Sequence, residues 1–251
     1  MIGPILFQIG SFKVYTHGFF VTIGVILASF VLYRLALKYH YNLSILFDLI
    51  IYTLFFGLLG ARLTYFFLYR SQFENTVDIL KIWQGGLVSW GGFIFGILAA
   101  TVILSLAKEK ILPWLDLLLV SSLLGLAVGR LGSFLSGELA GLPAKGFLAI
   151  LGVYPVTLFE SIYTFIVFLL LITLVLKFKS ILPAGFLSLN VIMLYSLGRF
   201  VVDFWRAEPA MAFGLSLGQL FSLSMFTIAL IIFIVLILQK RSQKRMTDAI
   251  S

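Results

Sequence analysis

The 251-residue chain contains no cysteine and few charged residues. The absence of cysteine excludes disulfides, thiolate metal sites and a cysteine nucleophile of its own, so any thiol chemistry must use a substrate's thiol. Charged residues make up 11% and apolar residues 61%, against about 25% and 45–50% in soluble domains, which excludes a water-soluble globule. In so apolar a chain, the net charge of +8 indicates membrane orientation and anionic lipid rather than nucleic acid.

Long apolar stretches dominate what is present. Stretches of about 18 or more residues with few charges predict transmembrane helices. We therefore expect an all-α, polytopic membrane protein that forms a single integral membrane domain over residues 1–251. Its seven expected spans are 16–37, 45–69, 86–107, 113–136, 156–175, 182–204 and 215–238.

The positions of lysine and arginine predict the orientation. An odd number of spans places the termini on opposite sides of the membrane, and the tail at 239–251 holds the densest basic cluster. A cytoplasmic tail puts ten of the 18 Lys and Arg on internal faces and five on external faces, in agreement with the positive-inside rule. We expect the N-terminus outside, with residues 1–15 as an outer-surface arm, and the C-terminus in the cytoplasm.

Glycines four residues apart predict close packing between helices. The pairs are Gly92 and Gly96, Gly125 and Gly129, and Gly137 and Gly141.

Three arginines fall within spans at a similar depth. A central Arg costs about 2.5–3.5 kcal/mol on membrane-insertion scales, so each is a functional candidate. In the expected topology Arg62, Arg130 and Arg199 each lie about six or seven residues before the outer end of a span, which is on the order of 10 Å below the surface.

The acids divide by side. Asp48 and Asp116 open spans at the inner side, and we interpret them as helix N-terminal acids stabilised by the macrodipole. Glu138, Glu160 and Asp203 fall in the outer part.

Arg199, Asp203 and Arg206 follow i, i+4, i+7 spacing and are expected to share one helix face. One explanation is an Arg199–Asp203 ion pair that only lowers the cost of burial. The other is an outward-facing cavity for an anionic head group, because guanidinium forks match phosphate geometry. The other polar or aromatic residues expected in such a cavity are His17, Tyr65, Trp90, Tyr195 and Gln219. His17 is either an interfacial, hydrogen-bonded residue or a base, and Trp90 either a cavity residue or part of an interfacial aromatic belt.

The segment GRLGSFLSGELAG at 129–141 resembles the signature of the bacterial prolipoprotein diacylglyceryl transferases, G-R-x-G-N-F-hydrophobic-N-x-E-x-x-G. It departs from that signature at Ser133 and Ser136, where the family usually has asparagine. It matches at Gly129, Arg130, Gly132, Phe134, Glu138 and Gly141.

Further blocks resemble the family in the same order along the chain. They are GARLTY at 60–65, IWQGGL at 82–87, YPVTLFE at 154–160, GRFVVDFWR at 198–206 and GQ at 218–219. The family's seven spans and outside N-terminus agree with the topology inferred from charge.

The departures from the family lie at polar positions. Trp90 stands where the family usually has His or Tyr, and His17 where a tyrosine often precedes the first-span glycine. Tyr154, Thr157 and Phe159 replace the His, Gln and Tyr of H-P-x-Q-L-Y-E, and Asp203 replaces a glutamate. The outer head region is reduced to 140–155.

The resemblance implies an enzyme that transfers a diacylglyceryl group from phosphatidylglycerol to the lipobox cysteine of a prolipoprotein signal peptide and releases glycerol phosphate. It also implies a multi-pass protein of the bacterial plasma or inner membrane, in contact with the lipid bilayer and without a cofactor. Arg130 and Arg199 would bind the phosphate, which needs fixed positive charge as the leaving group forms.

The identity of the base that takes the thiol proton is left open. Trp90 cannot act as this base. Glu138 is the first candidate because it lies in the matched signature, and Glu160, Asp203 and His17 remain. The expected catalytic residues are Arg130, Glu138, Arg199 and Asp203. The expected substrate-binding residues are His17, Arg62, Tyr65, Trp90, Ser133, Glu160, Arg206 and Gln219.

No metal site is expected, because the two histidines belong to opposite membrane sides and no two carboxylates share helical spacing. Two other functions compete with the transferase. One is a non-catalytic relative that keeps a cavity for anionic phospholipid. The other is a small transporter, which should place ionisable residues near the bilayer midplane.

Overall fold

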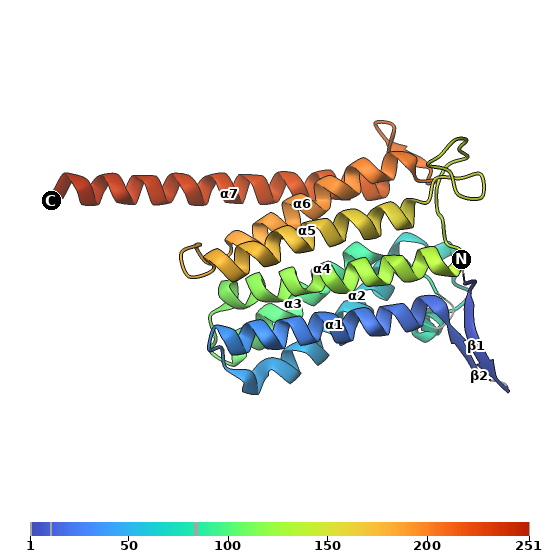
Figure 1. The fold of residues 1–251 in the computed structure, drawn as a ribbon, viewed down its shortest axis with the longest axis horizontal. Helices are drawn as coiled ribbons and strands as arrows, with labels where there is room; N and C mark the ends of the chain where they lie inside the picture. The colour runs from blue at the N-terminus through green and yellow to red at the C-terminus, as the bar shows by residue number, and fades with distance from the viewer. Residues whose placement is uncertain (1, 11, 83–84, 251) are drawn as a thin grey trace. The chain divides into compact units, whose positions relative to one another are not determined.

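The computed structural model describes residues 2–10, 12–82 and 85–250, and side chains within 2–10, 13–82 and 85–238. It is mostly helical (Figure 1). In the part of the chain that it describes, seven helices are long and apolar enough to cross a membrane. The protein is therefore an all-α, multi-pass membrane protein, as expected.

The helices agree with the expected spans to within about four residues, apart from the last, which continues to Ile250. Apolar residues surround most of them instead of forming one stripe, as is typical of helices that face lipid. The helices are α1 (Thr16–Lys38), α2 (Leu46–Leu68), α3 (Ser89–Leu106), α4 (Ile111–Ser136), α5 (Val156–Phe178), α6 (Phe186–Val202) and α7 (Leu217–Ile250). The strands are β1 (Ile5–Ile9), β2 (Phe12–Tyr15), β3 (Ala210–Ala212) and β4 (Leu215–Ser216), and the short 3₁₀ helices are η1 (Leu43–Ile45), η2 (Arg70–Gln72), η3 (Thr76–Leu80) and η5 (Asp203–Trp205). The basic side chains of the tail at 239–251 lie outside the described residues.

The chain divides into two compact units, which are described separately. Unit 1 comprises Met1–Val31 and Asp116–Ser251, and unit 2 comprises Leu32–Leu115. Strands β1 and β2 form an antiparallel hairpin in unit 1, and β3 and β4 form a second one. Ile5–Ile9 and Phe12–Tyr15, which belong to the expected surface arm, thus form strands.

In unit 1, glycines bring the start of α1 close to α4. A Cβ placed on Gly24 would lie only 2.6 Å from the carbonyl oxygen of Gly125. The N-terminal residues fasten the same two helices, because Thr16 donates its hydroxyl to Gly3 O (2.6 Å) and the amides of Ile2 and Gly3 donate to Leu135 O (2.9 and 3.0 Å). The first turn of α1 is therefore fixed beside the last turn of α4.

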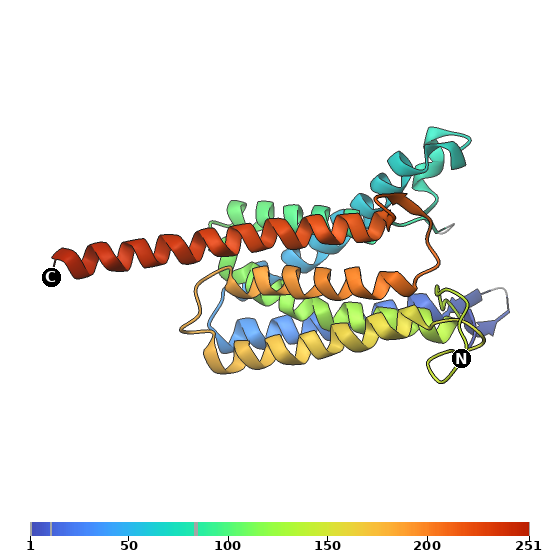
Figure 2. The same ribbon diagram turned by 90° about the horizontal axis from the view of Figure 1, so that it is seen from above.

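The connections after α4 and after α6 meet at one end of unit 1 (Figures 1 and 2). Leu142 N donates to Trp205 O (2.8 Å) and Ala207 N donates to Ala140 O (3.0 Å). A side chain on Gly141 would overlap the backbone carbonyl of Tyr154. The glycine that ends the 129–141 segment thus permits close contact between two stretches of the connection from α4 to α5.

The glycine pairs do not all act as expected. In unit 2, Gly92 and Gly96 lie against Gly57 of α2, which confirms close helix packing there. The prediction is wrong for Gly137 and Gly141, because α4 ends at Ser136 and both glycines lie in the following loop.

At the opposite end of unit 1, Asp116 joins α4 to the turn between α5 and α6. Its Oδ2 accepts from Lys179 Nζ (2.7 Å) and Gly185 N (3.0 Å), and its Oδ1 accepts from Ser188 N and Oγ (both 2.8 Å). The interpretation of Asp116 as an acid at its own helix N-terminus is wrong, because it lies beyond the first turn of α4 and instead caps the start of α6. Asp48 does lie in the first turn of α2.

Candidate anion-binding site

Glu160, near the start of α5, lies at the centre of an arginine cluster in unit 1. Its side chain is 2% exposed. Its Oε2 lies 3.0 Å from Arg130 Nε on α4, and its Oε1 lies 2.5 Å from Arg206 Nη2 and pairs with Arg199 Nη1 of α6. The structure thus brings together three of the predicted arginines, from separate segments, around one predicted acid.

Asp203 is the second buried acid of this cluster. It accepts from Arg199 Nε (3.1 Å) and from Arg206 Nε (2.9 Å). The expected single helix face is wrong in detail, because α6 ends at Val202 and Asp203 begins the 3₁₀ helix η5. In this tighter turn, side chains three residues apart face the same way, so Arg206 reaches the carboxylate that Arg199 also contacts.

Positive charge exceeds negative charge in the buried part of the cluster. Three guanidiniums face two buried carboxylates, and the additional acid, Glu208, is 39% exposed and 3.6 Å from Arg206 Nε. Arg130 is the most exposed of the three arginines, at 24%. Among the described residues, its two terminal nitrogens form no hydrogen bond. The Arg199–Asp203 ion pair therefore exists, but it does not account for the surplus cation.

Gln219 supports the fold beside this cluster. Its backbone N donates to Ser216 Oγ (3.2 Å), and its side-chain Oε1 accepts from Ser216 N (3.0 Å). This reciprocal pair is a capping box at the start of α7, and both residues are buried. The hydrogen bonds of Gln219 are thus used to begin the last span where the hairpin β3–β4 ends.

His17 and Ser133, from the facing ends of α1 and α4, are in contact. Ser133 Oγ lies 2.9 Å from His17 Nδ1. Ser133 is buried, whereas His17 is exposed. Ser133 follows Arg130 by three residues on α4, which places the two side chains on one side of that helix.

Glu138 lies apart from the arginine cluster in its contacts. Its backbone carbonyl accepts the Thr157 hydroxyl (2.6 Å), but its residue is exposed. In the described part of the chain its carboxylate forms no ion pair. The structure therefore keeps Glu138 as an accessible acid without bringing its carboxylate into contact with Arg130, Arg199 or Arg206.

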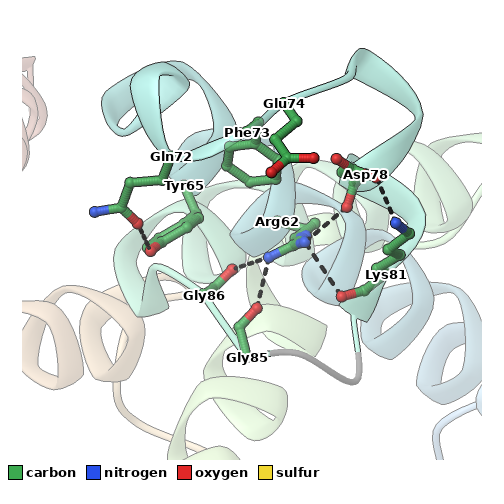
Figure 3. A pocket seen from close by; sticks show the side chains of 9 residues that line it. All are labelled: Arg62, Tyr65, Gln72, Phe73, Glu74, Asp78, Lys81, Gly85 and Gly86. Carbon is green, nitrogen blue, oxygen red and sulfur yellow. Dashed lines mark hydrogen bonds and ion pairs between the residues drawn. The ribbon is translucent and has the colours of Figure 1, made fainter.

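Arg62 belongs to unit 2, where it lines a pocket of about 350 Å³ (Figure 3). Its guanidinium donates to the carbonyls of Ile79 (2.9 Å), Asp78 (2.9 Å), Lys81 (3.2 Å), Gly85 (2.5 Å) and Gly86 (3.1 Å). These bonds use all three guanidinium nitrogens to hold the loop around η3. Arg62 is buried and organises backbone, in contrast to Arg130.

The other predicted residues of unit 2 lie near this loop or at the next helix. Tyr65 donates its hydroxyl to Gln72 Oε1 and lines the same pocket. Trp90 is half-buried in the first turn of α3. The pKa of Asp78 lies below its usual range because Lys81 and the amide of Asn75 donate to its carboxylate.

Sequence reasoning missed two contributors. Glu208 follows Arg206 by two residues, and this proximity in sequence is a signal that could have included it. Lys179, the partner of Asp116, comes from a segment 63 residues away, and no local pattern joins the two.

The fold and the cluster define a multi-pass membrane protein with a buried, net-cationic arginine site. The sequence model of the prolipoprotein diacylglyceryl transferase family matches residues 4–235. The chain belongs to this family, which confirms the resemblance and the expected enzyme class, a transferase.

Known relatives cover nearly the whole chain. The phosphatidylglycerol–prolipoprotein diacylglyceryl transferase of Clostridium botulinum strain Langeland is 33% identical over 238 residues, which is 88% of this chain and 92% of the relative. An enzyme of the same name from Clostridium kluyveri is 32% identical over 235 residues, or 87% and 91% of the two chains. Transferase 1 of Clostridium perfringens strain 13 is 26% identical over 262 residues, or 97% and 98%.

Proposed function

We propose that this protein transfers a diacylglyceryl group from phosphatidylglycerol to the lipobox cysteine thiol of a prolipoprotein, with release of glycerol phosphate. It performs this first step of lipoprotein maturation in the bacterial plasma or inner membrane. The names of the relatives support both substrates, and the absence of cysteine from the chain leaves the peptide as the source of the thiol.

The single observation that carries the proposal is the surplus cation of the arginine cluster. Three guanidiniums around Glu160 and Asp203 suit one phosphate, whose negative charge grows as the carbon–oxygen bond breaks. Arg130 offers its free terminal nitrogens to the phosphate, and Arg199 adds positive charge beside it. A bidentate guanidinium–phosphate contact fixes orientation as well as charge.

The two buried carboxylates orient the arginines and are not assigned a contact with the lipid. Glu160 links all three guanidiniums, and Asp203 links Arg199 to Arg206. Fixed donors of this kind need no reorganisation when the leaving group becomes charged. We therefore assign Arg130 and Arg199 to phosphate binding. Asp203 and Glu160 orient these two arginines, and Arg206 supports the two carboxylates.

The positive-inside pattern supports an outside N-terminus and a cytoplasmic C-terminus. With that topology the cluster opens to the outer leaflet. The cysteine-free chain makes a direct test possible, since single cysteines in place of Lys13 and Ser180 have no competing thiol. A membrane-impermeant maleimide added to intact cells or spheroplasts should label residue 13 and not residue 180, and the reverse pattern would contradict the topology.

The activity test uses purified full-length protein in phosphatidylglycerol liposomes with a synthetic lipobox peptide. We expect the peptide to gain the mass of one diacylglyceryl group, and Arg130→Ala to lower the initial rate by about 10²–10³-fold, the loss typical of removing one donor to a developing anion. Phosphatidylglycerol binding without any mass gain, where a related transferase works, would favour the non-catalytic relative. An unchanged rate in Arg130→Ala would contradict the phosphate assignment.

A further inference from the structure

The contact between His17 and Ser133 has the form of a base with a group that orients it. The imidazole is exposed at the start of α1, and the hydroxyl that meets it is buried in the last turn of α4. The buried Ser133 hydroxyl fixes the orientation of the imidazole ring, while the side of the ring away from Ser133 stays accessible. Elsewhere in proteins, a hydrogen bond to one ring nitrogen sets the tautomer and leaves the other nitrogen to act.

We propose that His17 accepts the proton of the attacking lipobox thiol and that Ser133 is the positioning residue for its imidazole. This inference rests on the function proposed above and names a residue for its open step. In the tautomer protonated at Nδ1, that nitrogen donates to Ser133 Oγ and Nε2 presents its lone pair. As the sulfur–carbon bond forms, the carbon–oxygen bond to phosphate breaks, the phosphate takes the electron pair, and the thiol proton passes to Nε2.

The position of the pair suits this step. Ser133 lies three residues after Arg130, about 4.5 Å further along the axis of α4, so the hydroxyl that contacts the imidazole belongs to the same side of α4 as the arginine assigned to the phosphate. The hydrogen bonds from the Thr16 hydroxyl to Gly3 O and from Gly3 N to Leu135 O fix the turn of α1 that carries His17. The geometry therefore provides a rigid support for a base at this end of unit 1.

The acids are less suited to this role. Glu160 and Asp203 are buried and each pairs with at least two arginines, so their oxygens are already engaged in ion pairs. Glu138 is accessible, but in the described part of the chain the hydrogen bond it accepts is to its backbone carbonyl, and no side chain orients its carboxylate. A neutral imidazole matches operation near pH 7 better.

The contact also brings together two residues at which this chain differs from most of the family. His17 replaces a tyrosine and Ser133 replaces an asparagine, and the structure shows these replacements 2.9 Å apart. The histidine or tyrosine usual in span three is Trp90 here, which has no basic atom. The chain thus lacks a basic group at position 90 and has one, His17, at the start of α1.

The test compares His17→Gln with wild type in the liposome and peptide assay from pH 6 to pH 10. The charged residues of β2 and α4 are Lys13, Arg130 and Asp116, of which Asp116 lies at the end of α4 away from His17. We expect His17→Gln to lose about 10²–10⁴-fold near pH 7. The deficit should shrink towards pH 10, because free thiolate, with a thiol pKa of about 8.5, then replaces the base.

Matched variants separate catalysis from folding. His40→Asn changes the other histidine of the chain, which has φ 57°, a conformation that Asn tolerates, and should keep the rate within twofold. Ser133→Ala should lower kcat about tenfold with little change in the KM for phosphatidylglycerol. The transfer activity of the double variant His17→Tyr with Ser133→Asn should exceed that of His17→Tyr alone.

The outcomes are distinct. A His17→Gln deficit that is equal at every pH would indicate a structural role and overturn the proposal, as would a rate and pH profile equal to wild type. A wild-type protein that gives no transfer, beside an active reference enzyme, would overturn the proposed function and this inference together.

Discussion

Asp116→Asn tests whether the end of unit 1 opposite the arginine cluster depends on one buried carboxylate. The wild-type side chain is 0% exposed and accepts four hydrogen bonds from Lys179, Gly185 and Ser188. Asparagine keeps one acceptor oxygen, which can still serve Ser188. Its NH₂ group then faces two other donors, the Lys179 ammonium and the Gly185 amide.

The magnitude follows from these contacts. Removing one partner of a buried ion pair costs about 3–5 kcal/mol, because the remaining charge is left buried. The Lys179 side chain is 8% exposed, so some rehydration favours the lower half of that range. We expect a loss of about 3–4 kcal/mol in the free energy of unfolding.

The assay is equilibrium unfolding of the full-length protein in dodecyl maltoside with increasing SDS, followed by far-UV circular dichroism. Asp48→Asn is the matched control, since Asp48 is exposed in the first turn of α2 and should contribute only about 0.3–1 kcal/mol. Adding Lys179→Met to Asp116→Asn should recover part of the loss by removing the orphan charge. Equal losses in the two Asp→Asn variants would refute the reasoning.

Three further outcomes follow from local contacts. Arg62→Lys should speed amide exchange in η3 by at least about tenfold, because one ammonium with three donors cannot serve five carbonyls; unchanged exchange would contradict this role. Gly141→Ala should cost about 1–3 kcal/mol in the SDS assay, because its Cβ would overlap the Tyr154 carbonyl, and a neutral effect would contradict the observed loop contact. Exchange in η3, expressed relative to the intrinsic amide rate at each pH, should also rise as pH falls below about 4. Asp78 has a lowered pKa in the folded protein, so its contribution is complete above the unfolded value of about 3.9 and is lost as pH falls through the lower folded value. In Asp78→Asn this acid-dependent rise should be absent.

The spans were predictable because lipid imposes one requirement on the whole length of a helix. Long apolar runs such as 156–175 can satisfy their backbone in a bilayer only as helices, so composition and length suffice. The hairpins were not predictable in this way. Residues 5–15 and 210–216 carry no long apolar run, and their strands pair only two by two.

The site was predictable only in part. Intramembrane arginines are rare enough to mark Arg130 and Arg199 from sequence alone. Spacing also paired Arg199 with Asp203, since that contact is local. The meeting of Glu160 with both arginines and the contact of His17 with Ser133 span 30 to 116 residues, and depend on how α1, α4, α5 and α6 pack. Arg62 is also an arginine within an expected span, so the sequence marked it equally. Its guanidinium nevertheless donates to carbonyls of its own unit.

The charge balance of the cluster connects its structure to its chemistry. A purely structural cluster would be most stable with paired charges, since an uncompensated buried ion is costly. Here two buried acids hold three guanidiniums, and the most exposed guanidinium, that of Arg130, retains free donors. We propose that this arrangement sacrifices stability in the absence of ligand and recovers it when an anion binds. The acids therefore serve to fix the arginines without neutralising the site, which is what binding a phosphate requires.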